Sequence, residues 1–268
     1  MRLLFLLITI CLLPIGLYAQ KKAANAAHLS SLKLVWSDEF NTGNTPDTSK
    51  WNYNIGNGEW GWGNNEQQYY TKDASNVRIE NGKLIIEARK EDKEKFKYTS
   101  ARMLTQGKAS WTYGRFEIRA KLPKGMGTWP AIWMLGDNIK TVGWPACGEI
   151  DIMEEVWKEP NVINWSTHSK MLNWPKGTQK TYKAKINTAT DQFHVYRLDW
   201  SEKSIQFYVD NRLYYTVQND GRGKDYYPFV DPQFLLVNLA IGGNMPGQTI
   251  DDTIFPVRME LDYVRVYQ

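Results

Sequence analysis

After residue 20 the chain consists of short segments in which apolar and polar residues alternate, and no window sustains the 3.6-residue period of a helix. Alternation with a period of two places one face of an extended strand against a core and the other toward solvent. Turn-forming residues separate the segments, and Asp210-Asn211 suits a tight hairpin turn. Many short strands of this kind predict an all-β sandwich of two antiparallel sheets. The clearest predicted strands are 83–89, 114–121, 194–200, 204–209, 213–217, 234–240 and 259–266.

The N-terminus has the features of a secretory signal peptide over residues 1–19. One early arginine precedes an apolar run, and Ala19 ends it, although cleavage after Ala24 or Ala27 is an alternative. Residues 20–30 are small, polar and aperiodic, which predicts a flexible linker. No later break divides the chain, so 31–268 is expected to be one catalytic domain of a secreted or periplasmic protein. A surface lipoprotein is disfavoured, because the residues before Cys11 lack the small side chain that lipoprotein processing prefers.

Charge and cysteine content exclude several classes of function. The formal net charge of +4 is too small to indicate a nucleic-acid partner or an anionic membrane, and no insertion of the mature protein into a membrane is expected. Without the leader, Cys147 is the single cysteine, so no intrachain disulfide can form, and a buried, inert thiol is expected. The 12 Trp, 15 Tyr and 9 Phe exceed what a core needs, and flat amphipathic rings suit stacking against sugars.

The segment 148–155 places Glu149, Asp151 and Glu154 among apolar strand formers. In a regular strand Glu149 and Asp151 share a face, but Met153 would take the place of Glu154. One extra residue, a β-bulge near Ile152-Met153, returns Glu154 to the face of Glu149. The two glutamates would then lie roughly 13 Å apart at Cα. Side chains that lean together would close the gap to about 5–6 Å, which is the separation in a retaining glycosidase.

Two neighbouring carboxyls resist joint ionisation, so one stays protonated while the other is charged, as acid-assisted displacement requires. The alternatives are a cation site or an acidic, solvated edge strand. The apolar residues between the acids predict burial of at least one face, which argues against the exposed edge.

Several motifs together resemble glycoside hydrolase family 16, in its laminarinase-like branch of endo-β-1,3-glucanases and mixed-linkage β-glucanases. They cover the chain from residue 32 to its end, in the order that the family has. The resemblance implies a jelly-roll β-sandwich of two antiparallel sheets with a concave cleft for substrate. The motifs are WSDEF (36–40), WGNNEQQY (62–69), WPAIWML (129–135), GEIDIME (148–154), LAIGG (239–243) and DYVRVY (262–267).

Carried over to this chain, the resemblance implies that Glu149 is the nucleophile and Glu154 the general acid/base. Asp151 is implied to bond the nucleophile and tune its charge. The implied reaction is double displacement through a glycosyl-enzyme. The residues implied to bind substrate are Trp60, Asn65, Arg102, Trp129, Trp133 and His168, each with a structural role as the alternative.

No cofactor is implied for catalysis, but the family often carries a structural Ca²⁺ away from the cleft. Its ligands map onto Glu39, the carbonyl of Gly82, and Asp262. The implied partner is a β-glucan polysaccharide or oligosaccharide bound by a monomer.

The resemblance favours an endo-acting hydrolase of β-1,3-glucan (laminarin) or mixed β-1,3/1,4-glucan over an enzyme for agarose or carrageenan. A transglycosylase on the same substrates and a non-catalytic glucan-binding protein are the alternatives, although the binding protein would not need all three carboxylates. The chain departs from the pattern at 155–157, at 161–180 and at Met245, where the family often has tryptophan.

Overall fold

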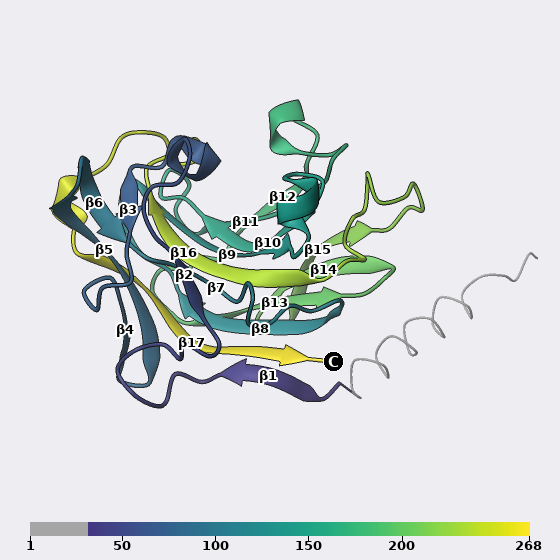
Figure 1. The fold of residues 1–268 in the computed structure, drawn as a ribbon, viewed down its shortest axis with the longest axis horizontal. Helices are drawn as coiled ribbons and strands as arrows, with labels where there is room; N and C mark the ends of the chain where they lie inside the picture. Colours follow the sequence, from purple (N-terminus) through teal and green to yellow (C-terminus); the bar gives the residue numbers. More distant parts are fainter. Residues whose placement is uncertain (1–31) are drawn as a thin grey trace, which may run out of the picture. The chain divides into compact units, whose positions relative to one another are not determined.

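The computed structural model describes residues 32–268, so the predicted leader (1–19) and linker (20–30) lie outside the described residues. Residues Leu34–Gln268 form one compact unit, in which two β-sheets pack face to face (Figure 1). The predicted all-β sandwich is confirmed.

The larger sheet has ten strands. They are β1 (Leu34–Asp38), β3 (Gln68–Tyr70), β4 (Val77–Glu80), β5 (Lys83–Lys93), β6 (Phe96–Ser100), β8 (Gly114–Lys121), β13 (His194–Trp200), β14 (Ser204–Val209), β15 (Arg212–Gln218) and β17 (Val257–Tyr267). Their order is β15–β14–β13–β8–β17–β5–β6–β3, with β1 paired to β17 and β4 to β5. The expectation of purely antiparallel sheets is wrong at one place, because β3 runs parallel to β6. Strands β4 and β5 supply the long connection that a parallel pair requires.

The smaller sheet has seven strands and carries the acidic segment. They are β2 (Asn52–Asn54), β7 (Arg102–Leu104), β9 (Thr128–Gly136), β10 (Glu149–Glu155), β11 (Val162–His168), β12 (Lys180–Lys185) and β16 (Gln233–Ile241). Their order is β12–β11–β10–β9–β16–β7–β2, and every pair is antiparallel. Strand β10 therefore has a neighbour on each side, β9 and β11, from which side chains can reach its carboxylates.

Four short helical turns lie in the connections between the strands. They are η1 (Gly61–Asn65), α2 (Ile139–Val142), η2 (Trp174–Lys176) and η3 (Asp252–Ile254). In Figure 1 the seven-stranded sheet is curved, and the segments that carry η1 and η2 rise at its opposite ends.

Alternation predicted the strands well. The strands β8, β13 and β14 have the expected bounds, and β5, β15, β16 and β17 extend the expected segments at one or both ends. The tight turn is also confirmed, because Asp210 and Asn211 both have positive φ, 47° and 68°. Positive φ at both central residues matches the right-handed twist of the hairpin strands that it joins.

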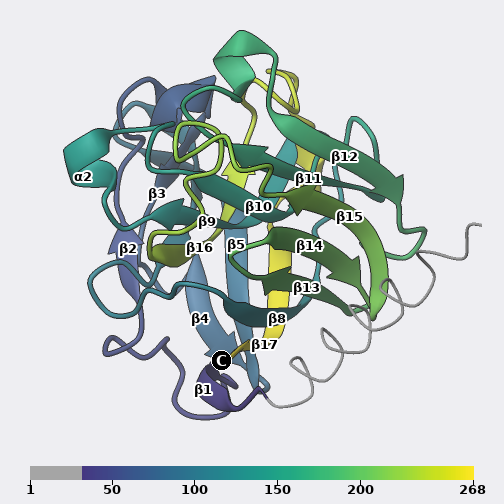
Figure 2. The same cartoon turned by 90° about the vertical axis from the view of Figure 1, so that its right-hand side faces the viewer.

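The core lies between the two sheets. Strand β10 contributes Ile150, Ile152 and Met153, which are fully buried in the same cluster as Leu198 of β13 and Phe207 of β14. Full burial of each such side chain stabilises the fold by about 1.5–3 kcal/mol. Since these residues fix β10 against the core, Glu149, Asp151 and Glu154 lie on the opposite face of the sheet. Figure 2 shows the edge where β12 approaches β15, and the stacked rings of Tyr182 and Tyr215 join the two sheets there.

Candidate active site

The predicted bulge in β10 is confirmed. Asp151 lies opposite Trp133 of β9 and Ser166 of β11, but Glu154 lies opposite Ala131 and Asn164. Three residue steps on β10 therefore match two on each neighbouring strand. The extra residue lets Ile152 and Met153 both enter the core, and it returns Glu154 to the face that carries Glu149 and Asp151.

Glu149 is surrounded by N–H groups. The indole Nε1 of Trp144 donates to its Oε2 at 2.6 Å, and Nε2 of His168 lies 3.9 Å from its Oε1. Trp144 belongs to the loop before β10, whereas His168 ends β11 directly opposite Glu149. The hydrogen bond from Trp144 fixes the orientation of the Glu149 carboxyl.

His168 is held in one tautomer by the chain that follows it. The backbone N–H of Trp174 donates to Nδ1 of His168 at 3.2 Å, so Nδ1 must be the unprotonated nitrogen. The proton of the neutral ring then lies on Nε2, which is 3.4 Å from Oδ2 of Asp151. This assignment rests on the bonding pattern, and it directs the His168 proton toward the carboxylates.

Asp151 lies buried between the two glutamates. Burial, together with the charge and hydrogen bonding of Glu149, raises its pKa well above the usual range. Glu149, Asp151 and His168 have ligand atoms within 4.8 Å of one another, so this group could also hold a cation. The structure therefore leaves the cation-site alternative for the acidic segment to experiment.

Glu154 has a different environment from Glu149. Its Oε1 accepts a hydrogen bond from Trp129 Nε1 at 3.1 Å. Removal from water and the charges of Asp151 and Glu149 raise the pKa of Glu154 well above 4.5, although His168 and Trp129 oppose the change. This carboxyl retains its proton at a pH where an ordinary glutamate has lost it.

A hydrogen-bonded network extends from the site across β16. Trp133 Nε1 donates to Asn238 Oδ1 at 2.8 Å, and Asn238 Nδ2 donates to the hydroxyl of Tyr70 at 3.1 Å. Tyr70 in turn donates to Glu66 Oε2 at 3.1 Å, and Gln68 donates to the same oxygen at 2.6 Å. The network fixes the orientation of the Trp133 ring beside Asp151.

Arg102 lies buried between two indole rings. Its guanidinium carbon is 4.7 Å from the ring centres of both Trp62 and Trp133. Its Nε has no hydrogen-bond partner among the described residues, and burial lowers the pKa of Arg102. A cation sandwiched in this way supports the ring of Trp133, whereas its enclosed Nε is not accessible to a bound sugar.

The structure places Trp60 and Asn65 at η1. Trp60 is 78% exposed, and Asn65 Nδ2 donates to Asn244 Oδ1 at 2.8 Å, which joins η1 to the loop after β16. Both residues have positive φ, 52° and 56°.

The predicted calcium ligands belong to the ten-stranded sheet and not to the sheet that carries β10. Glu39 follows β1, Gly82 lies in the turn from β4 to β5, and Asp262 lies in β17, so strand pairing brings their segments together. Two carboxylates and a carbonyl form an oxygen donor set that suits Ca²⁺. Each carboxylate is already paired: Glu39 with Arg265 at 2.9 and 2.7 Å, and Asp262 with Arg119. A calcium ion would have to compete with these arginines.

Sequence reasoning missed Trp144, Trp62, Glu66 and Asn238. Trp144 lies five positions before Glu149, and this proximity was an available signal. The other three reach the site through pairings between distant segments: Trp133 and Asn238, for example, are 105 positions apart. No local pattern marks such contacts.

No helix within residues 32–268 is long and apolar enough to cross a bilayer.

Comparisons with known proteins agree with this geometry. The sequence model "Glycosyl hydrolases family 16" matches residues 64–265. A "Beta-glucanase" of Rhodothermus marinus is 49% identical over 247 residues, which are 88% of this chain and 85% of that protein.

Two solved structures are similar throughout the described unit. The laminarinase from Rhodothermus marinus has a TM-score of 0.85 at 47% identity, with 88% of this chain and 97% of that chain covered. A non-specific endo-β-1,3(4)-glucanase of the same family has a TM-score of 0.85 at 46% identity, with 89% and 95% covered. That structure, of a mutant, holds a 1,3-β-D-cellobiosyl-glucose at its active site.

Proposed function

Since the chain belongs to family 16 of the glycosyl hydrolases, we propose that it is an endo-acting β-glucanase in which Glu149, Asp151 and Glu154 carry the chemistry. The observation that carries the assignment of roles is the contrast between the two glutamates. Glu149 lies among N–H donors, whereas Glu154 lies near two carboxylates that raise its pKa. The raised pKa keeps Glu154 protonated, as the acid of a retaining glycosidase must be, and leaves Glu149 as the carboxyl that attacks.

In the first step, the Glu149 carboxylate attacks the anomeric carbon of the sugar. The glycosidic C–O bond breaks as Glu154 transfers its proton to the leaving oxygen, and a glycosyl ester of Glu149 forms. Trp144 and His168 orient Glu149 for this attack through their N–H groups. Asp151, between the two glutamates, tunes the charge of the nucleophile.

In the second step, the ionised Glu154 removes a proton from water. The water oxygen attacks the anomeric carbon, the bond to Glu149 breaks, and the sugar leaves with its original configuration. Glu154 is again protonated, so the cycle closes without a cofactor. The pKa of Glu154 must fall in the ester intermediate. It does so because esterification removes the negative charge of Glu149, which is one of the charges that raise this pKa.

Substrate binding is assigned to the face that surrounds these carboxyls. Trp133 and Trp129 present rings on β9, and the guanidinium of Arg102 packs against Trp133. Trp60 and Asn65 are proposed to contact more distant sugars of the chain. An extended substrate of this kind fits attack within a polysaccharide and not at its end.

The proposed substrates are β-1,3-glucan and mixed β-1,3/1,4-glucan. Support comes from the laminarinase and the non-specific endo-β-1,3(4)-glucanase to which this chain is similar along most of its length. The preference between the two linkages is set by loops where this chain departs from the family pattern.

We also propose a cellular location, an oligomeric state and a structural metal ion for this protein. The leader predicted at 1–19 supports secretion or a periplasmic location. The protein is proposed to act as a monomer. A structural calcium ion is proposed at Glu39, Gly82 and Asp262, where it would compete with the arginines that pair with both carboxylates.

The test is a reducing-sugar assay on laminarin, barley β-glucan, lichenan, agarose and carrageenan. We expect release from the first three, with early loss of viscosity and a ladder of oligosaccharides. Glu149→Gln should abolish turnover, whereas Glu159→Gln, a change in the exposed turn after β10, should not. Full activity in Glu149→Gln refutes the assigned role of Glu149.

Azide rescue distinguishes the two glutamates. With an activated β-glycoside, azide should restore turnover of Glu149→Ala and give the α-glycosyl azide, because azide replaces the nucleophile. It should restore Glu154→Ala and give the β-glycosyl azide, because azide attacks the glycosyl-enzyme. The same azide anomer from both variants contradicts the assignment. Products analysed with and without an added oligosaccharide acceptor separate hydrolysis from transglycosylation.

A further inference from the structure

Strand β11 carries an asparagine whose amide oxygen is buried without a hydrogen-bond partner. Asn164 is 2% exposed, and no donor among the described residues bonds its Oδ1. Its Nδ2 makes one long contact, of 3.5 Å, to the carbonyl of Val162 on the same strand. A buried acceptor that lacks a donor costs free energy, so we expect a donor to form nearby in one state of the protein.

Asn164 lies directly opposite Glu154, because the pairing of β10 with β11 brings these two residues together after the bulge. Directly opposite residues of antiparallel strands have Cβ atoms about 4.5–5.5 Å apart on the same face of the sheet. The side chains of an asparagine and a glutamate can close this gap to a hydrogen bond. Lys183 of β12 flanks Asn164 on its other side, but its ammonium group is paired with Glu159. The neighbour that can supply the donor is therefore Glu154.

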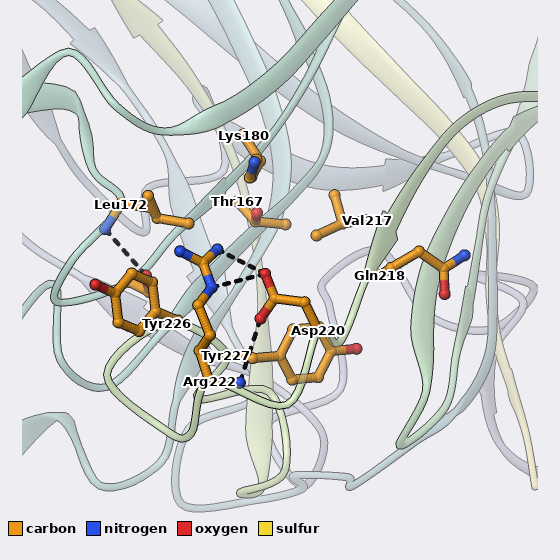
Figure 3. A pocket seen from close by; sticks show the side chains of 10 residues that line it. Thr167, Leu172, Lys180, Val217, Gln218, Asp220, Arg222, Tyr226 and Tyr227 are labelled. Atoms are coloured by element: carbon orange, nitrogen blue, oxygen red, sulfur yellow. Dashed lines mark hydrogen bonds and ion pairs between the residues drawn. The ribbon is translucent and has the colours of Figure 1, made fainter.

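The alternation of side chains along β11 places Asn164 on the face that carries the carboxylates. Trp165 enters the core between the two sheets. Thr167 lines a small pocket with Val217 of β15, a strand of the other sheet, so it also lies on the inner side (Figure 3). Asn164 and His168, at the alternate positions, lie on the opposite face.

Glu154 supplies the missing donor when it is protonated. Its Oε1 accepts the N–H of Trp129 at 3.1 Å, which leaves Oε2 to carry the proton of the neutral acid. Burial and the charges of Asp151 and Glu149 raise the pKa of Glu154 well above 4.5. His168 also acts on this carboxyl and opposes the change. The free enzyme therefore has an acidic O–H group next to the unpaired amide oxygen.

We propose that Asn164 is a positioning residue for the acid: its Oδ1 accepts the hydrogen bond of protonated Glu154 in the free enzyme, until the glycosidic oxygen of the substrate takes that place. A hydrogen bond to the neutral form of a carboxyl disfavours the loss of its proton. Asn164 thus extends to higher pH the range in which the acid can act, and its amide does not itself titrate. The proposal rests on the proposed function, because it takes Glu154 as the proton donor.

The test compares Asn164→Leu with the wild type on two substrates over a range of pH. Leucine has nearly the shape of asparagine, so Glu154 stays buried while the acceptor is lost. On a β-1,3-gluco-oligosaccharide, whose leaving group needs a proton, the alkaline limb of kcat/KM should move to lower pH by about half to one unit, with the acidic plateau kept. On a dinitrophenyl β-glycoside, whose leaving group needs no proton, kcat/KM should match the wild type.

Two further variants support this comparison. Asn187→Ala, a change at an exposed asparagine between β12 and β13, is the control and should match the wild type on both substrates. Asn164→Val also lacks an acceptor, and valine favours a strand, so this variant should repeat the shift. It takes the place of Asn164→Leu if leucine prevents folding.

The outcomes distinguish this role from the proposed function. If the wild-type protein cleaves no glucan, the proposed function fails and the role of Asn164 fails with it. If the wild type is active and the alkaline limb of the apolar variants is unmoved, only the role of Asn164 is overturned. An equal loss at every pH and on both substrates also overturns it, because it shows that Asn164 supports the fold of β11 and not the proton of Glu154.

Discussion

Glu155 provides a test of how the fold tolerates an acid that the proposed chemistry does not use. It follows Glu154 in β10 but points into the sandwich, where it is fully buried. Its Oε1 accepts the N–H of Asn161 at 3.1 Å, whereas Oε2 has no partner among the described residues. Burial raises the pKa of Glu155 from 4.5 to about 7.

This pKa makes the stability of the fold depend on pH. Between pH 4.5 and 7 the folded protein keeps the proton on Glu155 while the unfolded chain has lost it, so the folded state binds more protons. Stability then falls as pH rises through this window. At about 1.4 kcal/mol per pH unit, the loss is about 3 kcal/mol, and it is complete above pH 7. Glu155→Gln cannot ionise and should not show this loss.

The measurement is the free energy of unfolding in urea at pH 5, 6, 7 and 8. Relative to the wild type, Glu155→Gln should gain about 2.5 kcal/mol between pH 5 and pH 8. Titration of Asp151 and Glu154 occurs in both proteins and cancels in the difference. Glu159→Gln, which changes an exposed acid paired with Lys183, is the control and should parallel the wild type. Parallel pH curves for the wild type and Glu155→Gln would show that Glu155 is ionised in the fold, and the reasoning would be wrong.

Three further predictions concern the site and the calcium ion. Asp151→Asn should lower kcat less than Glu149→Gln does. It should also move the alkaline limb of kcat/KM to lower pH, because the charge of Asp151 helps to raise the pKa of Glu154. A pH–rate profile with an unmoved alkaline limb contradicts this prediction. Arg102→Lys should raise KM for laminarin roughly three- to tenfold, since lysine loses the planar stacking between two indoles; an unchanged KM argues against a role in binding. Excess chelator should lower the melting temperature with little effect on the rate at ambient temperature. An unchanged melting curve removes the calcium proposal, and loss of the rate itself would support a cation among Glu149, Asp151 and His168.

The fold was largely predictable because strands buried on one face have a strong local signal. Strand β8 alternates apolar and charged residues along its whole length, and its bounds follow directly from that pattern. Strands of three residues, such as β2, β3 and β7, have no period to detect. Their pairing, including the parallel contact between β3 and β6, depends on the positions of longer strands.

The site was predictable only where its residues lie in one segment. The three carboxylates and the bulge follow from 148–154, because the apolar residues there must enter the core while Glu149, Asp151 and Glu154 share the other face. The buried hydrogen bonds of Tyr70 with Asn238 and Glu66, and the stacking of Arg102 on Trp62, depend on the register between β16, β7 and the η1 segment. Such contacts require the assembled sheet.

The bulge explains why two glutamates on one strand acquire different chemistry. Because β10 is an inner strand, Glu149, Asp151 and Glu154 each face one residue of β9 and one of β11. Before the bulge, Glu149 lies opposite His168 and within reach of the loop that carries Trp144. After the bulge, Glu154 has moved along the sheet to Trp129 of β9, away from those donors. The extra residue therefore sets both the shared face and the unequal surroundings of Glu149 and Glu154, and these surroundings suit the roles of nucleophile and acid proposed for them.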